Sequence, residues 1–407
     1  MADMVGDDVV GKIMASDAYA RAVAQLDADH DRTVTDIITL TEIPAPPFAE
    51  EAKAAHYLEM LRAHGLEDVE LDGIGNAMGV RRGNGNGGLI VVAAHLDTVF
   101  PAGTDVRVRR EGSKLFAPGV GDDTRSLAVL LAYIRAMDAA GIKTRHDILF
   151  VGDVGEEGLG DLRGVRHLFN EGKYKDRIEA FFTVDSPEMD NIVTGGVGSK
   201  RYRAIFRGPG GHSFGAFGIV SPMNAMAQAM VELSRMQVPA KPKTTYSASV
   251  VGGGTSVNAI PNEVWMEVDL RSEAPVELAR IEARFHRILA DVTDAENHAR
   301  STAQGAVKVE AVLIGDRPAG NTGHGTDIVR HATAAITAHG FAPRHVFSST
   351  DANIPMALGI PAIKIGSGGT SGRAHSLDEW IDVEKSNSLN GMAAGLTAIL
   401  AVAGVAE

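Results

Sequence analysis

Acidic and histidine residues follow several apolar runs of the sequence, at the points where those runs end. Examples are His95 after LIVVAA and Glu156 after ILFVG. Buried runs of this kind do not tolerate charge, so we expect the charges at their ends to point into a shared crevice at the carboxyl edge of a sheet. The full set is His95, Asp97, Asp122, Asp123, Glu156, Glu157, Asp185 and His375.

The chemistry available to this set is metal binding. The sequence has no cysteine, which excludes thiolate ligands, iron–sulfur clusters and disulfides. Imidazole with carboxylate suits zinc, with manganese or cobalt as possible substitutes. Two dications need roughly five ligands with one bridging carboxylate. The set supplies these ligands and leaves one glutamate unused.

Each of these residues also has a structural explanation when it is taken alone. A histidine at a strand end is often a structural residue, and Asp122 with Asp123 could cap the following helix. Glu156 and Glu157 could form a solvated pair in a loop. The recurrence of such residues at several independent strand ends favours the metal site. The His-x-Asp spacing adds to this, because a metal-bound histidine usually donates its other N–H to a carboxylate.

The elements that must position these residues follow an α/β order in the first half of the chain. Continuous apolar runs predict strands buried on both faces of a mostly parallel sheet, and periodic patterns between them predict helices. The expected strands lie near 87–97, 147–154 and 180–185, and the expected helices near 49–65, 126–141 and 162–170.

The pattern changes after about residue 195. Half-exposed strands and amphipathic helices follow in the order β-α-β-β-α-β, which is typical of a split βαβ sandwich, and the α/β pattern resumes near residue 328. We therefore predict an α/β fold with a mostly parallel sheet flanked by helices and an inserted lid domain. The predicted catalytic domain covers 1–195 and 316–407, and the lid covers 196–315.

Charge is distributed unevenly between these domains. The 407 residues contain 39 Lys+Arg and 52 Asp+Glu, a net charge of −13, which argues against a nucleic-acid-binding protein. The predicted lid has 13 Lys+Arg and 11 Asp+Glu, a net of +2, so the remainder carries −15. A slightly positive lid is a weak indication of an anionic small substrate.

Targeting and membrane segments are not expected. The acidic start MADMVGDDVVGKIM lacks the basic and apolar regions of a signal peptide. The longest apolar stretch, residues 391–406, is shorter than the roughly 18–20 residues of a membrane span. These features predict a buried terminal helix and a cytoplasmic enzyme.

Five short motifs resemble those of one known family. They are His-Leu-Asp-Thr-Val, Gly-Val-Gly-Asp-Asp, Gly-Glu-Glu-Gly, Val-Asp-Ser and Ala-His-Ser-Leu-Asp-Glu, in this order over about residues 90–380. Together they resemble the dizinc exopeptidase family of glutamate carboxypeptidase, the bacterial aminotripeptidase, aminoacylase and succinyl-diaminopimelate desuccinylase. The inserted lid is also similar to that family.

The resemblance implies a role for each residue at the strand ends. His95 and Asp185 would bind one zinc ion. Glu157 and His375 would bind the other, with Asp122 bridging the two.

Two further residues would act beside the metal ions. Asp97 would orient His95. Glu156 would be the general base that deprotonates the bridging water and later protonates the leaving amine.

The resemblance also implies roles for the predicted lid. His212 would stabilise the oxyanion, often across a dimer interface, and Asn258 and Arg271 would hold the substrate. Arg271 suits a free carboxylate because its guanidinium binds one through two hydrogen bonds, although a surface ion pair would explain it as well. Backbone N–H groups of Gly368 and Gly369 could bind the same carboxylate, or their loop could be a plain turn.

The sequence therefore predicts a zinc-dependent exopeptidase of the carboxypeptidase or di- or tripeptidase type, acting on a small anionic peptide, and a homodimer formed through the lid. An N-acyl amino acid deacylase is the alternative reaction. A catalytically silent ligand-binding or scaffold protein is the alternative of another class. One departure is Thr124-Arg125-Ser126, where members of the family commonly have Lys-Gly-Gly or similar.

Overall fold

The computed structural model describes residues 2–85 and 88–406. The chain falls into two units, which we call the first and second unit. The first comprises Met1–Gly196 and Asn321–Glu407, and the second comprises Val197–Gly320. The predicted boundary at 315/316 lies inside strand β14 (Lys308–Arg317), which stays paired with strand β9 (Gly198–Arg207) as far as Arg317.

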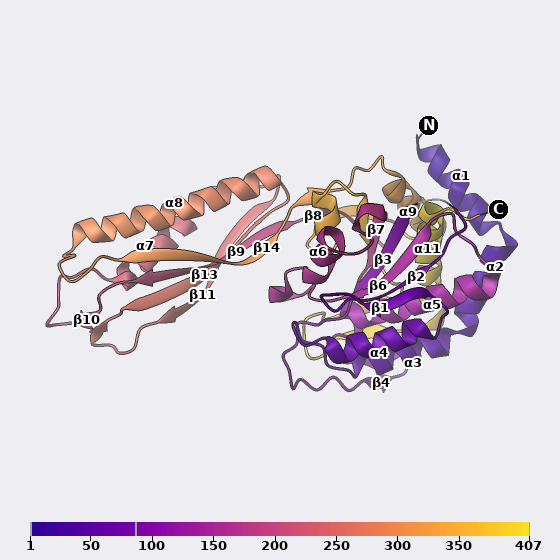
Figure 1. Cartoon of the computed structure of the whole chain (residues 1–407), viewed down its shortest axis with the longest axis horizontal. Coiled ribbons are helices and arrows are strands. Elements are labelled where there is room, and N and C mark those ends of the chain that lie inside the picture. The colour runs from indigo at the N-terminus through magenta and orange to yellow at the C-terminus, as the bar shows by residue number, and fades with distance from the viewer. Residues whose placement is uncertain (1, 86–87, 407) are drawn as a thin grey trace. The chain divides into compact units, whose positions relative to one another are not determined.

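The first unit is built on a nine-stranded sheet in the order β1-β2-β6-β3-β7-β17-β8-β15, with β16 paired to β8 (Figure 1). Strands β6, β3, β7 and β17 run parallel, so their carboxyl ends meet at one edge. The strands of this sheet are β1 Glu67–Leu71, β2 Ala77–Arg81, β3 Leu89–His95, β6 Asp147–Asp153, β7 Ile178–Val184, β8 Asn191–Gly196, β15 Gly320–Asn321, β16 Arg344–Ser348 and β17 Ala362–Ile365.

Helices cover both faces of this sheet, which explains why its central strands read as continuous apolar runs. Ile90 and Val92 of β3 pack with helices such as α5 and α11, whereas Leu89 and Val91 pack toward α6 and α10. The predicted strands and flanking helices are confirmed. The helices are α1 Ala2–Met14, α2 Asp17–Ala28, α3 His30–Thr41, α4 Glu51–Arg62, α5 Arg125–Ala140, α6 Arg163–Asn170, α9 Asp327–Ala338, α10 Asn353–Ala357 and α11 Lys385–Ala403.

A second, four-stranded sheet in the first unit has the order β18-β19-β5-β4. Its strands have three residues each: β4 Arg109–Glu111, β5 Lys114–Phe116, β18 Thr370–Gly372 and β19 Trp380–Asp382. This sheet holds the segment after β5 against the segment between β18 and β19. Residues as far apart in the chain as Asp122 and His375, which are separated by 253 positions, therefore meet there.

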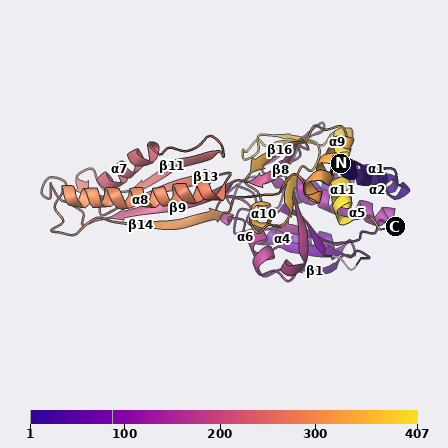
Figure 2. The ribbon, with the colours of Figure 1, turned by 90° about the horizontal axis from the view of Figure 1, so that it is seen from above.

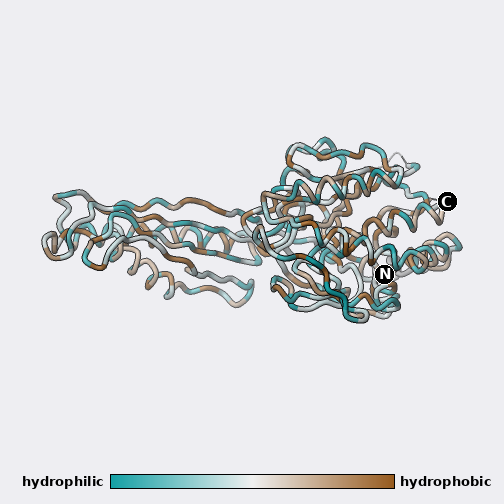
Figure 3. Tube along the Cα trace, turned by 90° about the horizontal axis from the view of Figure 1, so that it is seen from below, coloured by the Kyte–Doolittle hydropathy of each residue, from teal (hydrophilic) through white to brown (hydrophobic). Residues whose placement is uncertain are grey.

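The second unit is an antiparallel sheet in the order β11-β13-β9-β14, with α7 and α8 packed against one face (Figures 1 and 2). Along β13 alternate residues are buried, and apolar and polar segments also alternate along this unit in Figure 3. The remaining bounds are α7 Pro222–Ser234, α8 Pro275–Ala299, β10 Gly211–His212, β11 Thr244–Gly253, β12 Ala259–Ile260 and β13 Glu263–Ser272. The order β9-α7-β11-β13-α8-β14 is the predicted split βαβ pattern.

The apolar stretch at 391–406 forms most of α11, a helix buried in the core of the first unit. Within residues 2–85 and 88–406, no helix combines the length and the hydropathy that a membrane span requires.

Candidate active site

Asp122 lies between two histidines. Its Oδ1 is 3.0 Å from Nε2 of His95, and its Oδ2 is 3.0 Å from Nε2 of His375. Nε2 of His375 is also 2.9 Å from Oε1 of Glu157. Asp122, Glu157 and His375 offer ligand atoms that all lie within 4.8 Å of one another. Three segments that are distant in the sequence thus converge on one carboxylate.

Asp185 belongs to a second group of possible ligands. It follows β7, where its N–H donates to the carbonyl of Ile365 at 3.0 Å. His95, Asp123 and Asp185 also offer ligand atoms within 4.8 Å of one another. Asp123 is fully buried, and its Oδ2 accepts the N–H of His95 at 3.2 Å. The two groups, joined through His95 and Asp122, bring together all five residues that the sequence predicts as ligands.

The main chain orients the ring of His95. Its Nδ1 is 2.9 Å from the main-chain oxygen of Asp97, which can only accept, so Nδ1 carries the hydrogen of the neutral ring. The lone pair of Nε2 then faces Oδ1 of Asp122. Two lone pairs at this distance repel unless a proton or a metal ion lies between them.

The carboxylate of Asp97 does not have the predicted contact. Its Oδ1 is 3.7 Å from Nδ1 of His95, which is beyond hydrogen-bond distance. Its two oxygens instead accept the N–H groups of Glu156 at 3.0 Å and Glu157 at 2.9 Å. The main-chain oxygen of Asp97 holds the histidine, and its side chain holds the segment that carries both glutamates.

Electrostatics in this cluster favour positive charge at both histidines. Hydrogen bonds to Asp122 and Glu157 raise the pKa of His375 to about 10. Burial opposes protonation of His95, but its contacts with Asp122 and Asp97 raise its pKa well above the usual value. Burial also opposes ionisation of Asp122, yet the two histidines hold the pKa of that carboxyl below its usual range.

Glu379 is a residue that the sequence motifs did not single out. It is buried, and its carboxylate accepts three backbone N–H groups, from Gly119 at 2.9 Å, Gly121 at 2.8 Å and Asp122 at 2.9 Å. Burial raises its pKa to about 7 in spite of these bonds. Glu379 therefore fixes the segment that ends at the bridging carboxylate.

Three other buried charges surround the cluster. Burial raises the pKa of Asp153 to about 7 and that of Asp351 well above its usual value. The Nζ of Lys53 donates to Oγ1 of Thr124 at 3.0 Å, and burial lowers its pKa to about 8. Asp153 ends an apolar run, as the predicted ligands do. Lys53 lies in an ordinary helical pattern, so no feature of the sequence marked it as part of the site.

Arg125, part of the departure from the family pattern, is also buried. Burial lowers its pKa to about 10, although Tyr133, Glu188 and Asp382 oppose this. Its Nη2 lies 3.2 Å from the position that a Cβ on Gly369 would occupy. The residue that departs from the family pattern thus places a buried cation against the Gly368–Gly369 loop, which could bind the substrate carboxylate.

Gly368 cannot serve as predicted. Its N–H donates to the carbonyl of Pro187 at 2.8 Å, as the N–H of Ser367 does to Ser186 at 2.8 Å, so neither points to a substrate. These bonds hold the loop onto the segment after β7. Both glycines have positive φ, +86° at Gly368 and +88° at Gly369, which other residues rarely adopt. Gly369 remains the predicted donor.

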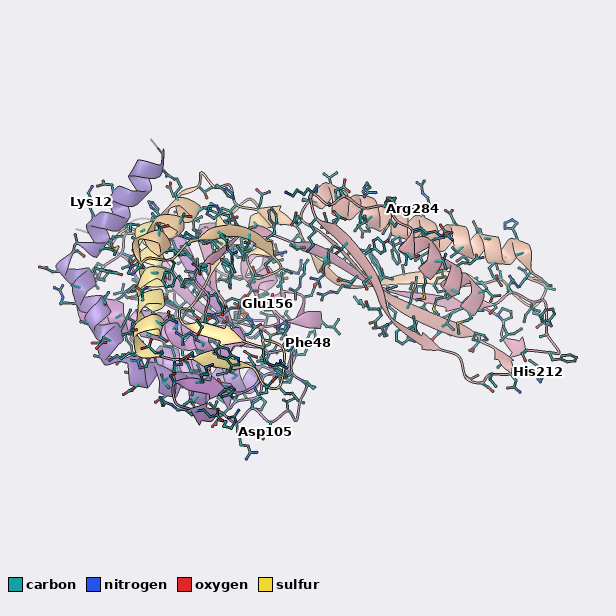
Figure 4. The ribbon with its side chains drawn as sticks, turned by 180° about the vertical axis from the view of Figure 1, so that it is seen from behind. Lys12, Phe48, Asp105, Glu156, His212 and Arg284 are labelled. Carbon is teal, nitrogen blue, oxygen red and sulfur yellow. The ribbon has the colours of Figure 1, made fainter. Side chains whose placement is uncertain are left out.

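His212 lies in the second unit, on β10, and is exposed (Figure 4). Its Nδ1 is 3.2 Å from the N–H groups of both Phe214 and Gly215 and accepts from them. A nitrogen that accepts two backbone N–H groups carries no hydrogen, so the neutral ring is protonated at Nε2. The turn that follows His212 therefore presents its Nε2–H outward as a donor.

The other two predicted lid residues lie on separate parts of the second unit. Asn258 is exposed, and its main-chain oxygen accepts the N–H of Ser213 at 2.9 Å, which links its loop to the His212 turn. Arg271 lies on the sheet face opposite the helices, where its Nε donates to Oδ2 of Asp269 at 2.6 Å. The sequence left open that Arg271 forms a surface ion pair, and the contact with Asp269 is such a pair.

The donor set fits divalent metal ions. Five carboxylates, those of Asp122, Asp123, Glu156, Glu157 and Asp185, share the cluster with two imidazoles, and each group of donors spans less than 4.8 Å. Nε2 of His95 lies 3.0 Å from a carboxylate oxygen of Asp122, a contact that needs either a proton or a metal ion between the two atoms. Figure 4 shows Glu156 inside the first unit, and in the chain it follows the carboxyl end of β6. Metal ions would neutralise this concentration of negative charge.

The sequence of this chain matches one protein family and is similar to curated enzymes. A model of peptidase family M20/M25/M40 matches residues 91–401. Succinyl-diaminopimelate desuccinylase of Corynebacterium glutamicum is 24% identical over 359 residues, covering 85% of this chain and 90% of that protein.

Solved structures share the fold. Aminopeptidase PepT from Bacillus cereus gives a TM-score of 0.73 at 22% identity, covering 92% of this chain and 98% of that one. A dinuclear metal-binding peptidase from Bacillus subtilis gives 0.66 at 15% identity, again covering 92% and 98%. The predicted α/β fold and the assignment to metal-dependent hydrolases are confirmed. The chain belongs to peptidase family M20/M25/M40.

Proposed function

We propose that this chain hydrolyses the amide bond of a small peptide or N-acyl amino acid that carries a free carboxylate, with two zinc ions per chain as cofactors. Manganese or cobalt would be substitutes. The observation that carries the proposal is the position of Asp122, with each carboxylate oxygen 3.0 Å from a histidine Nε2. The proposed metal ligands are His95, Asp122, Glu157, Asp185 and His375.

Glu156 is the proposed general base. Bound zinc ions would lower the pKa of the attacking water and polarise the substrate carbonyl. Glu156 takes the proton of that water and returns it to the leaving nitrogen. Its backbone N–H is held by Asp97, and it is 8% exposed, so its position is fixed in a largely enclosed site.

The second unit is the proposed lid and dimerisation domain. His212 donates its Nε2–H to the oxyanion that forms on the substrate carbonyl, supported by the two backbone N–H groups that occupy Nδ1. Arg271, Asn258 and the N–H of Gly369 bind the substrate carboxylate. The expected assembly is a homodimer through this unit, which presents His212 to the partner's site.

An exopeptidase and a deacylase both use this chemistry. The desuccinylase, aligned over 90% of its own length, favours a deacylase, and the aminopeptidase structure favours a peptidase. A panel of di- and tripeptides with free or blocked termini, together with N-acyl amino acids, separates them. Hydrolysis of any member excludes the catalytically silent alternative.

Substitution of the base tests the mechanism. We expect Glu156→Gln to retain the metal ions and lower kcat by about 10²- to 10⁴-fold, the contribution of a positioned general base. Metal content and single-turnover rates are measured side by side. Glu171→Gln, a change at an exposed glutamate that ends α6, is the matched control and should leave both unchanged. A Glu156→Gln enzyme with nearly full kcat would remove Glu156 from this role.

A further inference from the structure

The turn that carries His212 also exposes two phenylalanines. Phe214 is 88% exposed and Phe217 is 89% exposed, the second lying three residues after the first. Val257, in the neighbouring loop, is completely exposed. Full burial of such side chains typically stabilises a protein, so three of them exposed together indicate a contact surface rather than a packing element.

The turn at residues 212–217 is held by hydrogen bonds and is followed by buried residues. The exposure of its two phenylalanines is therefore not the result of a loose or distant segment. Ile219 and Val220, which follow directly, are buried at 8% and 0% exposure. The N–H of Ala216 donates to the carbonyl of His212 at 2.8 Å, and that of Phe217 to Phe214 at 3.3 Å. The backbone is therefore ordered by its own hydrogen bonds, and the two rings are still directed into solvent.

The exposed apolar residues lie close in the chain to residues that we propose contact the substrate. The backbone N–H of Phe214 donates to Nδ1 of His212, which fixes the main chain of Phe214 beside the imidazole. Val257 precedes Asn258, whose main-chain oxygen holds Ser213 at 2.9 Å, and His212 pairs with Ala259 in the small β10–β12 sheet. The turn and the loop joined to it thus carry the proposed oxyanion donor, an amide and three exposed apolar side chains.

From this surface, which we call the Phe214–Phe217–Val257 patch, we infer that Phe214 and Phe217 form an apolar subsite for the acyl side of the substrate. The inference rests on the proposed function. When His212 binds the oxygen of the scissile carbonyl, the two other groups on the carbonyl carbon, the acyl group and the leaving nitrogen, lie nearest to it. The proposed carboxylate-binding residues hold the nitrogen side of an N-acyl amino acid or C-terminal peptide bond, so the acyl group is left for the apolar side chains. Phe214 and Phe217 then cover it, which selects substrates with an apolar side chain or acyl chain there.

The test is a matched substrate series in which only the acyl-side group changes, from glycyl or acetyl to leucyl, phenylalanyl or longer acyl chains. We expect wild type to favour the apolar members. Phe214→Ala and Phe217→Ala should lower kcat/KM for those members at least tenfold and for the glycyl or acetyl members less than threefold. His212→Ala should lower kcat for all members alike.

Val276→Ala is the control, because Val276 is 78% exposed on α8 of the same unit and away from the patch. Val276→Ala should change neither the kcat/KM values nor their ratio between the apolar and the glycyl or acetyl members. Equal losses across the series would overturn the inference, and equal losses with dissociation of the dimer in light scattering would assign the patch to the contact between copies. Absence of hydrolysis by wild type for the whole panel would instead refute the proposed function.

Discussion

At the scale of single residues, carboxylates in this protein organise the site as well as supply its ligands. The side chain of Asp97 holds two backbone N–H groups and that of Glu379 holds three. Both are buried, where a hydrogen bond to a charged acceptor is worth more than in water. The positions of Glu156, Glu157 and Asp122 therefore depend on two acids that lie outside the groups of candidate metal ligands.

Glu379 gives the sharpest test of this arrangement. In Glu379→Gln one oxygen becomes an NH2 group, which cannot accept and faces the backbone donors. We expect the segment ending at Asp122 to shift, metal affinity to fall about 10- to 100-fold, and the free energy of unfolding to fall by about 1–3 kcal/mol. Competition with a chelator measures the metal affinity, and urea unfolding measures the free energy of unfolding.

The matched control is Glu384→Gln, because Glu384 also accepts two backbone N–H groups, from Ser386 and Asn387, but caps α11 on the surface. It should leave metal affinity unchanged. If Glu379→Gln bound metal as tightly as wild type, Glu379 would have no part in positioning Asp122.

At the scale of elements, the sequence predicted what depends on burial. The run LIVVAA predicted β3 because both faces of that strand are covered, and strand ends predicted most of the ligands. The sheet β18-β19-β5-β4 could not be predicted, because its three-residue strands carry no periodicity. That sheet brings His375 and Glu379 to Asp122. The role of His375 was therefore available from the motif alone. Glu379 ends the same motif, but nothing in its position indicated that it accepts backbone N–H groups.

The end of α4 gives a prediction about stability and pH. His64 follows this helix, and burial together with the positive charges of Arg135 and Arg32 lowers its pKa to about 4. The unfolded chain takes up a proton near pH 6.5 and the folded chain does not, so stability is lost as the pH falls through that range. With allowance for solvent screening, the loss from this group between pH 7 and 5 is about 1 kcal/mol.

We expect His64→Gln to remove this part of the pH dependence. Urea unfolding at pH 7 and pH 5 gives the difference for each protein. His56→Gln, at an exposed position on the same helix, should retain the wild-type dependence. A His64→Gln protein with the full wild-type loss would show that this histidine titrates normally in the folded state.

At the scale of the whole molecule, the two units differ in chemistry. The change from continuous apolar runs to alternating strands marked the second unit, although β14 extends beyond the predicted boundary because its pairing with β9 continues. The acidic residues concentrate in the first unit, where the candidate ligands lie, while the predicted lid is slightly positive. This distribution agrees with the proposal that the first unit holds metal ions and that residues of the second bind a carboxylate.

In the proposed function, hydrolysis depends on a pair of metal ions held by His95, Asp122, Glu157, Asp185 and His375. The number of metal equivalents per chain in purified active protein, followed through chelation and reconstitution, tests this dependence. We expect close to two equivalents, loss of activity on chelation and recovery with zinc. Full hydrolytic activity in protein stripped of metal would contradict this dependence.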